Sequence, residues 1–298
     1  MNEASYTIIG AGLSGLHLGQ LLKKNPAKTI ILEKSPGLGG RVATRRIEGL
    51  GFDHGCPLIQ DWPDIKSFLN HYLPDSVLKK EQDDFYLTGG MNQLGKAMAQ
   101  DLTVHRNVRV SYLKREDHKW IVMTDEGPIF QSEKVVLTAP LPQALELLIN
   151  SDIKLNDENR LRSIQYSKGI MGLFIAKDLP SLFKKIHPEG HELFFMKKRN
   201  LHPDGLVFMS NANLSEEYFA QNDFEVLPII INKIQESLGT ALSYSSYQIK
   251  RWRYVKPLKS LQSPYLEVAP NLFLIGDSFL YPDIRGSFLS AEALAKVL

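Results

Sequence analysis

The sequence predicts an α/β protein in which a doubly wound parallel sheet is interleaved along the chain with an α+β domain on a mostly antiparallel sheet. Three observations predict this class. The chain opens with an apolar run, a glycine cluster, a helical pattern and a second apolar run. Strand-like runs alternate with polar connections over residues 151–264, and an apolar strand pattern returns at residues 271–275. The opening is typical of parallel sheets with crossover helices, whereas the middle is typical of antiparallel strands.

Composition excludes several classes of protein. The 298 residues are enough for two domains at roughly 150 residues each. Lys and Arg number 35 and Asp and Glu 33, so the net charge of +2 gives no reason to expect nucleic acid or a membrane as a partner. Cys56 is the only cysteine, and the start of the chain lacks the features of a secretory signal. We expect a cytoplasmic protein that acts on a small molecule; the sequence does not indicate its oligomeric state.

The predicted elements follow from apolar periodicity and from turn residues. In the first part of the chain, we expect strands at 6–9 and 29–32, a helix between them that ends at Asn25–Pro26, and extended segments at 42–48 and 52–59. Further strands are expected at 108–110, 120–124, 134–138, 169–176, 192–196, 206–210 and 247–253, with a turn at Gly127–Pro128. Helices are expected after Gly90, over 144–149 and 224–238, and from about Ser287.

The chain therefore leaves its first domain and returns to it. We assign residues 1–60, 88–146 and 266–298 to a cofactor-binding domain, and residues 61–87 and 147–265 to a substrate domain.

The glycine cluster has the spacing of a dinucleotide-binding turn, G-x-G-x-x-G, between a strand and a helix. Gly10 permits the tight turn, Gly12 lets a pyrophosphate approach the backbone, and Gly15 lets the helix pack closely on the strand. The first helical residues, Leu13 and Ser14, present free N–H groups to phosphates. The second strand ends at Glu33, whose carboxylate can accept hydrogen bonds from an adenosine ribose.

Three further features favour FAD over a nicotinamide cofactor in this Rossmann-like domain. A second glycine run, Gly37 to Gly40, precedes Arg41, which we expect to contact a phosphate. Asp277 follows Gly276 directly after a strand, where a carboxylate can bind ribityl hydroxyls. A helix that opens near Ser287 presents its N-terminus to an electron-rich flavin edge.

On these motifs the chain resembles the flavin-containing amine oxidase superfamily, and within it most closely the renalase family. The residues that carry the resemblance lie along nearly the whole chain: Gly10–Gly15, Glu33–Lys34, Gly39–Arg46, Phe52–Gly55, Gly89–Met91, Thr138–Pro140 with Gln143, Arg251–Tyr254, Gly276–Ser278 and Gly286–Ala291. Residues 151–222 match only loosely.

The resemblance implies an FAD domain interleaved with a substrate domain. The implied chemistry is oxidation of off-pathway isomers of dihydronicotinamide dinucleotides, with dioxygen reoxidising the flavin to give hydrogen peroxide. It also implies cofactor contacts at Lys34, Gly40, Phe288 and the backbone of Val110. Two residues depart from the family pattern, since Cys56 and Val255 stand where alanine is usual.

Candidate pocket residues come from the run Arg251 to Tyr254 and from His54. On a strand, Trp252 and Tyr254 face the opposite side from Arg251 and Arg253. In one interpretation the aromatic residues cover the flavin and an arginine meets an anionic substrate. In the other, Trp252 is a core residue and the arginines are solvated. His54 is either a flavin contact or a structural histidine.

We find no metal-binding or nucleophile motif. His187 and His191 are separated by Pro188 and Gly190, which predict a loop rather than a ligand-bearing helix, so we expect no metal site. Residues 257–298 contain no cysteine, and Cys56 lies in an apolar stretch, so we expect the FAD to be bound non-covalently.

Three hypotheses for the function remain. They are a renalase-like oxidase, an amine oxidase or desaturase-like flavoenzyme, and a non-catalytic flavin-binding protein.

Overall fold

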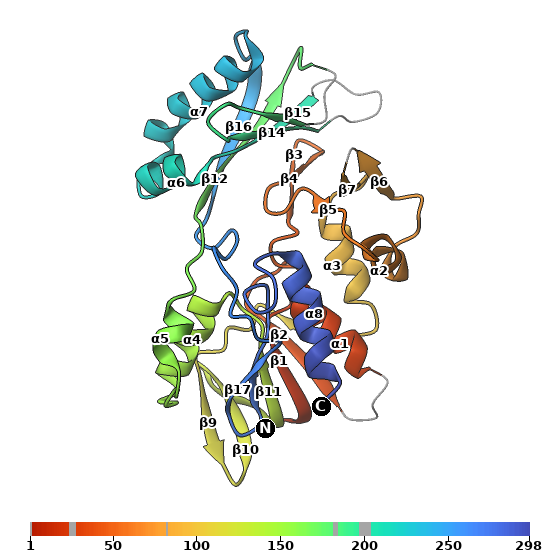
Figure 1. The fold of residues 1–298 in the computed structure, drawn as a ribbon, viewed down its shortest axis with the longest axis vertical. Helices are drawn as coiled ribbons and strands as arrows, with labels where there is room; N and C mark the ends of the chain where they lie inside the picture. The colour runs from red at the N-terminus through yellow and green to blue at the C-terminus, as the bar shows by residue number, and fades with distance from the viewer. Residues whose placement is uncertain (1, 24–27, 82, 181–183, 197–203) are drawn as a thin grey trace. The chain divides into compact units, whose positions relative to one another are not determined.

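The protein, seen here in a computed structural model, folds as two compact units that are each assembled from distant segments (Figure 1). Residues 2–23, 28–81, 83–180, 184–196 and 204–298 are described, so the predicted helix end at Asn25–Pro26 lies outside them. The first unit comprises residues 1–40, 94–166 and 256–298, and the second comprises 41–93 and 167–255. This division differs from the domain bounds expected from the sequence chiefly at residues 41–60, which belong to the second unit, and at residues 147–166, which belong to the first. The bounds also differ at residues 88–93 and 256–265.

The first unit contains both strands and helices. Its strands are β1 (Asn2–Ile9), β2 (Thr29–Glu33), β8 (Val104–Arg106), β9 (Tyr112–Glu116), β10 (Lys119–Thr124), β11 (Gly127–Leu137), β17 (Leu266–Ala269) and β18 (Leu272–Leu274). Its helices are α1 (Leu13–Leu22), α4 (Leu141–Asn150), α5 (Glu158–Arg162) and α8 (Ile284–Ala295). Helix α3 (Asn92–Met98) begins in the second unit and ends in the first.

The sheet of the first unit has a parallel centre with antiparallel additions. Strands β18, β11, β1, β2 and β8 run parallel in that order, while β17 and the β9–β10 pair are antiparallel. Helix α1 packs against α8 and β2. A Cβ atom at Gly19 would lie 2.9 Å from Cδ1 of Ile31, so the absence of a side chain lets α1 approach β2 closely. The predicted doubly wound sheet is confirmed.

The second unit is built around an antiparallel sheet. That sheet has the order β13 (Lys184–Ile186), β14 (Glu192–Met196), β15 (Asp204–Met209), β12 (Gly169–Ala176) and β16 (Tyr244–Trp252). The hairpin β3 (Thr44–Ile47) and β4 (Leu50–Asp53) and the small sheet β5 (Ile59–Gln60), β7 (Asp84–Leu87) and β6 (Leu78–Glu81) complete its strands among the described residues. Its further helices are α2 (Ile65–Tyr72), α6 (Ala212–Tyr218) and α7 (Asp223–Leu238).

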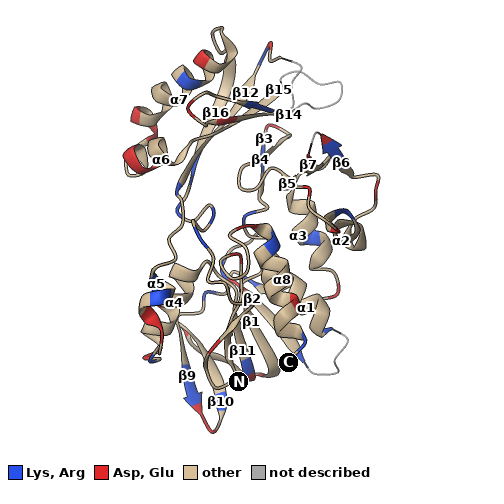
Figure 2. Ribbon diagram, viewed as in Figure 1, with Lys and Arg blue, Asp and Glu red and all other residues tan. Residues whose placement is uncertain are grey.

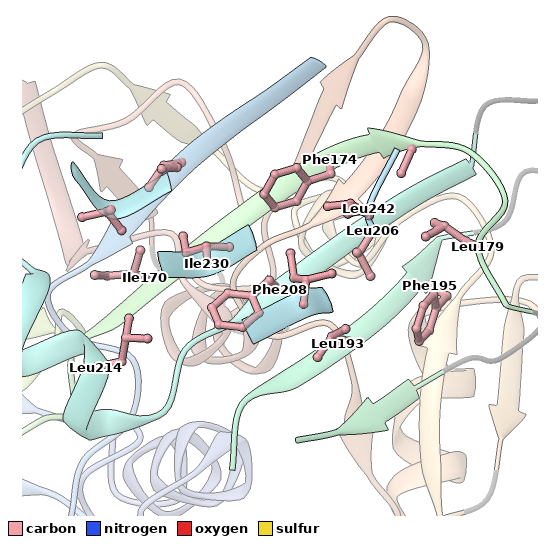
Figure 3. Packing of buried hydrophobic residues seen from close by; sticks show 14 residues of the cluster. Ile170, Phe174, Leu179, Leu193, Phe195, Leu206, Phe208, Leu214, Ile230 and Leu242 are labelled. Atoms are coloured by element: carbon pink, nitrogen blue, oxygen red, sulfur yellow. The ribbon is translucent and has the colours of Figure 1, made fainter. Parts of the chain in front are cut away.

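Strand β12 is buried on both faces, because each face carries its own apolar cluster. Ile170 and Phe174 pack with Val226, Ile230 and Ile234 of α7, as Figure 3 shows for part of this cluster. The other face packs against the β3–β4 hairpin, and the cluster there consists of Ile47, Leu50, Phe52, Met171, Leu173, Ile175, Phe194 and Val207. This second cluster explains why residues 41–60 belong to the second unit.

Three local predictions are wrong, each for a local structural reason. Residues 108–110 are not a strand, because Asn107 adopts a positive φ of 59° directly after β8. Gly127 and Pro128 lie within β11 rather than in a turn, which is formed by the two residues before them. Helix α8 begins at Ile284 rather than near Ser287, because the side chain of Asp283 accepts a hydrogen bond from the N–H of Arg285 and caps it.

Within the described part of the chain, no helix has both the length and the apolar character needed to cross a bilayer.

Candidate active site

The glycine turn between β1 and α1 is crowded on one side and open on the other. A Cβ atom at Gly10 would lie 2.5 Å from Oγ1 of Thr138, and one at Gly15 would lie 2.0 Å from the carbonyl oxygen of Gly10. Gly10 also has a φ of +114°, which disfavours any larger residue. By contrast, a Cβ atom at Gly12 would meet no other atom within 4 Å. The open space at Gly12 is where the sequence predicts the pyrophosphate.

The start of α1 fits an anion. Gly12 is the N-cap residue and supplies no side-chain cap. The N–H groups of Leu13, Ser14 and Gly15 belong to the first turn of the helix, where no intrahelical acceptor exists. They therefore remain available to phosphate oxygens, at the positive end of the helix dipole. The residues at this turn fit the pyrophosphate of FAD.

Glu33 is fixed beside this turn at the end of β2. Its side chain is 9% exposed; Oε2 accepts a hydrogen bond from the N–H of Ala11 (2.8 Å). Oε1 accepts hydrogen bonds from the N–H (2.8 Å) and the hydroxyl (2.5 Å) of Ser35. Because Oε1 already has two donors, Oε2 is the oxygen with room for a ribose hydroxyl.

The second glycine pair packs directly on the first turn. The N–H of Gly39 donates to the carbonyl of Ala11 (2.8 Å), and a Cβ atom at Gly40 would lie 3.2 Å from Cα of Gly12. Gly95 of α3 approaches from the other side, since its Cβ would lie 2.5 Å from Cα of Gly39. The two glycine runs therefore form one layered backbone surface.

Asp277 is held at the carboxyl end of β18. It is buried, and its Oδ1 accepts a hydrogen bond from the hydroxyl of Tyr166 (2.8 Å). The preceding Gly276 has a φ of +152°, and its N–H donates to the hydroxyl of Ser290 in α8 (3.0 Å). The buried hydroxyl of Ser278 has no partner among the described residues. This loop is thus pre-organised, with an unused hydroxyl beside the predicted ribityl ligand.

The remaining predicted cofactor residues of the first unit lie on its helices and loops. Ser287 and Phe288 are buried in α8. Val110 is half-buried in the loop after β8, which is joined to β2 by a hydrogen bond from the N–H of Val108 to the carbonyl of Glu33 (2.9 Å). Lys34 is exposed, and its Nζ donates to Oε1 of Gln143 (3.2 Å).

In the second unit, His54 and Trp252 form a stacked pair. Their ring centroids lie 5.5 Å apart with an angle of 27° between the planes, and Nε1 of Trp252 donates to the carbonyl of His54 (2.6 Å). The neighbouring segment is anchored by Arg41, whose carbonyl accepts the N–H of Cys56 (2.8 Å) and whose Nη1 donates to the carbonyl of Val255 (3.0 Å). The two residues that depart from the family pattern, Cys56 and Val255, are therefore both bound to Arg41.

Arg251 lies on the opposite face of β16 from Trp252. Its guanidinium forms an ion pair with Asp223 at the start of α7 and donates to the carbonyl of Gln221 (2.7 Å). Figure 2 shows that acidic residues gather on α6 and at the start of α7. Tyr254 is half-buried just after β16. The structure therefore places Trp252 and His54 together and Arg251 against α7.

Burial shifts the pKa values of His54, a member of this pair, and of the adjacent Asp53. Burial, together with the positive charges of Lys250 and Arg45, lowers the pKa of His54 to about 4. Burial raises the pKa of Asp53, although Oδ1 of Asp53 accepts hydrogen bonds from the hydroxyl of Thr44 (2.5 Å) and the N–H of Met91 (2.8 Å). His54 is therefore neutral at neutral pH, and Asp53 ties β4 to the residues before α3.

The described residues include one group with the composition of a metal site, His187, Glu189 and His191, which lie in the predicted loop with ligand atoms within 4.8 Å of one another. Nδ1 of His187 accepts the N–H of Glu189, and Nδ1 of His191 accepts the N–H of Asn211, each at 3.0 Å. Each neutral ring therefore carries its proton on Nε2, which faces Glu236 or Glu189. A metal on Nε2 would need that proton on Nδ1, which the backbone N–H opposes.

Three positioning residues were not found from the sequence. Tyr166 orients Asp277, Ser290 fixes Gly276, and Thr44 holds Asp53. Ser290 lies one helical turn after Ser287, so the spacing was a usable signal. Tyr166 lies in a segment with no recognisable pattern. Thr44 lies in the predicted extended segment 42–48, but the sequence did not indicate that its hydroxyl meets Asp53.

Two family models match the chain. That of an NAD(P)-binding Rossmann-like domain matches residues 8–72, and that of a flavin containing amine oxidoreductase matches residues 58–174. Renalase from Mus musculus is 24% identical, covering 98% of this chain and 97% of its own length. Polyamine oxidase 5 from Oryza sativa subsp. japonica is 23% identical, covering 76% of this chain and 47% of its own length.

Among solved structures, the chain is similar to a CLA-producing fatty acid isomerase from P. acnes. The TM-score is 0.75 at 13% identity, over 99% of this chain and 98% of that chain. At this identity the likeness shows the fold. The matches together confirm the predicted fold class, the resemblance to renalase, and an oxidoreductase that depends on FAD.

Replacing Gly12 separates cofactor binding from folding. Gly12→Ala should change the stability of the apoprotein by less than about 1 kcal/mol. Gly12 has an extended backbone (φ −74°, ψ −179°) and its Cβ would meet nothing, while alanine is a poorer N-cap than glycine. The substitution should weaken FAD binding, since the methyl group occupies the space of the pyrophosphate. The matched variant Gly15→Ala should destabilise the apoprotein by about 1–3 kcal/mol through overpacking. Urea unfolding and FAD titration by fluorescence quenching measure both effects; unchanged FAD affinity in Gly12→Ala would place the phosphates elsewhere.

The pKa of His54 predicts a loss of stability in acid. Its folded value of about 4 lies below the ordinary 6.5, so the unfolded chain binds more protons between these pH values. The free energy of unfolding should therefore fall by about 3 kcal/mol from this residue alone as the pH drops from 7.5 to 4. His54→Gln should lose that much less over the same range, measured by urea unfolding. The control His71→Gln replaces an exposed histidine, and an equal effect of both variants would contradict the assignment.

Proposed function

We propose that this FAD-dependent oxidoreductase oxidises off-pathway isomers of dihydronicotinamide dinucleotides and uses dioxygen as its electron acceptor. The observation that carries the proposal is the similarity to renalase, because it extends over 98% of this chain and 97% of that relative. The polyamine oxidase relative is matched over less than half of its own length.

The residues of the first unit would bind the cofactor. We propose that Gly10, Gly12, Leu13, Ser14 and Gly15 hold the pyrophosphate and Glu33 the adenosine ribose, with the ribityl chain on Asp277. Lys34, Gly40, Val110, Ser287 and Phe288 of the same unit, together with Arg41, the first residue of the second unit, complete the proposed set. When bound, FAD supplies the acceptor for a hydride from the donor and returns two electrons, with two protons, to dioxygen as hydrogen peroxide.

Side chains of the chain itself would orient the donor and exclude water. The stacked rings of His54 and Trp252 offer an apolar wall. His54 is unprotonated at neutral pH, since its pKa is about 4, so it does not act there as a cationic acid. Hydride transfer needs no side-chain nucleophile, and positioning is then the main contribution of the protein.

A second candidate is an amine oxidase or desaturase-like enzyme. The match of residues 58–174 to the flavin containing amine oxidoreductase model favours it, as does the polyamine oxidase relative. The similar fold of a fatty acid isomerase shows that this fold alone does not select the reaction. A flavin-binding protein without turnover is the third candidate.

The donor can be identified from the colour of the flavin. Under anaerobic conditions, off-pathway dihydronicotinamide dinucleotide isomers should bleach the flavin absorbance rapidly, and admission of air should restore it with one hydrogen peroxide per donor. Ordinary dihydronicotinamide dinucleotide serves as the matched control. Bleaching by amines but by none of the isomers would favour the second candidate, and no bleaching by any donor would favour the third.

The FAD should be bound without a covalent bond. Cys56 is half-buried, and its Sγ donates to the carbonyl of Leu58 (3.0 Å), which leaves the thiol in a structural contact. Acid precipitation should therefore give a colourless pellet and release FAD into the supernatant. A yellow pellet that becomes colourless in Cys56→Ala would show attachment at this residue.

A further inference from the structure

One face of strand β16 carries a row of polar side chains beside an apolar cluster. The pairing register sets Gln248 opposite Leu173 and Lys250 opposite Met171, so their side chains share a face. Leu173 and Met171 belong to the cluster that packs against the β3–β4 hairpin. Trp252 continues the same row and stacks on His54. Because β16 is the last strand of its sheet, this row borders the apolar cluster rather than lying within it.

Three buried polar atoms, two in this row and one on the neighbouring His54, have no hydrogen-bond partner among the described residues. They are Oε1 of Gln248, Oγ of Ser246 and Nδ1 of His54. Nearly all buried polar atoms in folded proteins are paired, so three unpaired atoms on one surface need an explanation. A bound molecule with N–H or O–H donors would supply the missing partners.

The same surface is positively charged. Lys250 lies on the same face of β16 as Trp252, the residue that stacks on His54. Arg45 is paired with Phe52 across the hairpin, so it lies on the face that packs toward the sheet. Neither cation has a carboxylate partner within the described ranges, whereas Arg251 on the opposite face is paired with Asp223. Two unneutralised cations favour an anionic ligand and repel an ammonium group.

We propose that Arg45, His54, Gln248 and Lys250 form a recognition surface for the donor, an inference that rests on the proposed function. The two cations would bind the phosphates of a dinucleotide. Gln248 and His54 would pair with the carboxamide of its dihydronicotinamide ring. This surface would select anionic dinucleotides over amines. All four of its residues belong to the second unit.

The charge contribution is tested with Lys250→Met and the control Lys177→Met, which replaces an exposed lysine of the same unit. Anaerobic stopped-flow reduction of the holoenzyme should show a Kd for the dinucleotide isomer raised about tenfold in Lys250→Met, as expected for loss of a charge-assisted contact. The limiting rate of reduction should stay within about twofold. The Kd of the corresponding riboside, which has no phosphate, should not change in either variant.

The role of Gln248 has a signature that a structural residue would not give. Gln248→Leu removes a buried atom without a partner, so the variant should be as stable as the wild type or more stable. It should nevertheless bind the dinucleotide and the riboside more weakly. A variant that loses stability while keeping its affinity for both would overturn the assignment of Gln248.

A binding measurement separates this inference from the proposed activity. Calorimetric titration of the holoenzyme with oxidised nicotinamide dinucleotide should show weaker binding to Lys250→Met than to Lys177→Met. Equal binding to both, or no binding to the wild type, would overturn the recognition surface. If no dihydronicotinamide isomer bleaches the flavin but this binding still depends on Lys250, the proposed function fails and the recognition surface stands.

Discussion

Where the first strand of the parallel sheet turns into α1, several backbone segments pack directly on one another without side chains between them. Gly15 packs against the carbonyl of Gly10, and Gly95 packs against Gly39. The N–H of Gly39 donates a hydrogen bond to the carbonyl of Ala11. This stack of close contacts brings α1, the second glycine run and α3 to one place. A Cβ atom at Gly15 or Gly95 would clash with the neighbouring backbone, so these contacts fix how closely the segments pack. Open space remains at Gly12. The proposed cofactor site depends on this constraint more than on any single polar contact.

The second unit is organised by a different constraint, the burial of β12 on both faces. The side chains of β16 alternate between the same two faces of the sheet. Arg251 faces α7 and is neutralised there, while Lys250 and Gln248 border the cluster of the β3–β4 hairpin. Polar atoms on that second side are left without partners. On the face toward α7, Asp223 neutralises the charge of Arg251. On the face proposed for the donor, Lys250 has no such carboxylate partner among the described residues, and the carbonyl oxygen of the Gln248 side chain is unpaired.

The sequence predicted those features that depend on local spacing. The strand at 169–176 was found with its observed bounds, and the helix at 224–238 within one residue, because apolar period and the capping residues agree there. The start of α8 was missed because a single capping side chain, Asp283, decided it. Contacts such as Tyr166 with Asp277 join residues far apart in the chain, so no spacing rule could find them. Strand alternation predicted that Arg251 and Trp252 face opposite sides of the sheet. It could not predict that Arg251 forms an ion pair with Asp223 of α7.

The interleaving of the two units has a consequence for biosynthesis. The chain passes between the units four times, and the last segment, 256–298, adds β17, β18 and α8 to a sheet begun by the first residues. Until that segment leaves the ribosome, β11 has its parallel neighbour β1 but lacks β18, and the apolar residues Val135, Val136 and Leu137 remain unpaired on that side. The nascent chain would therefore expose an unpaired, aggregation-prone sheet edge for much of its synthesis. The sheet of the first unit is therefore completed only after β17 and β18 have been synthesised.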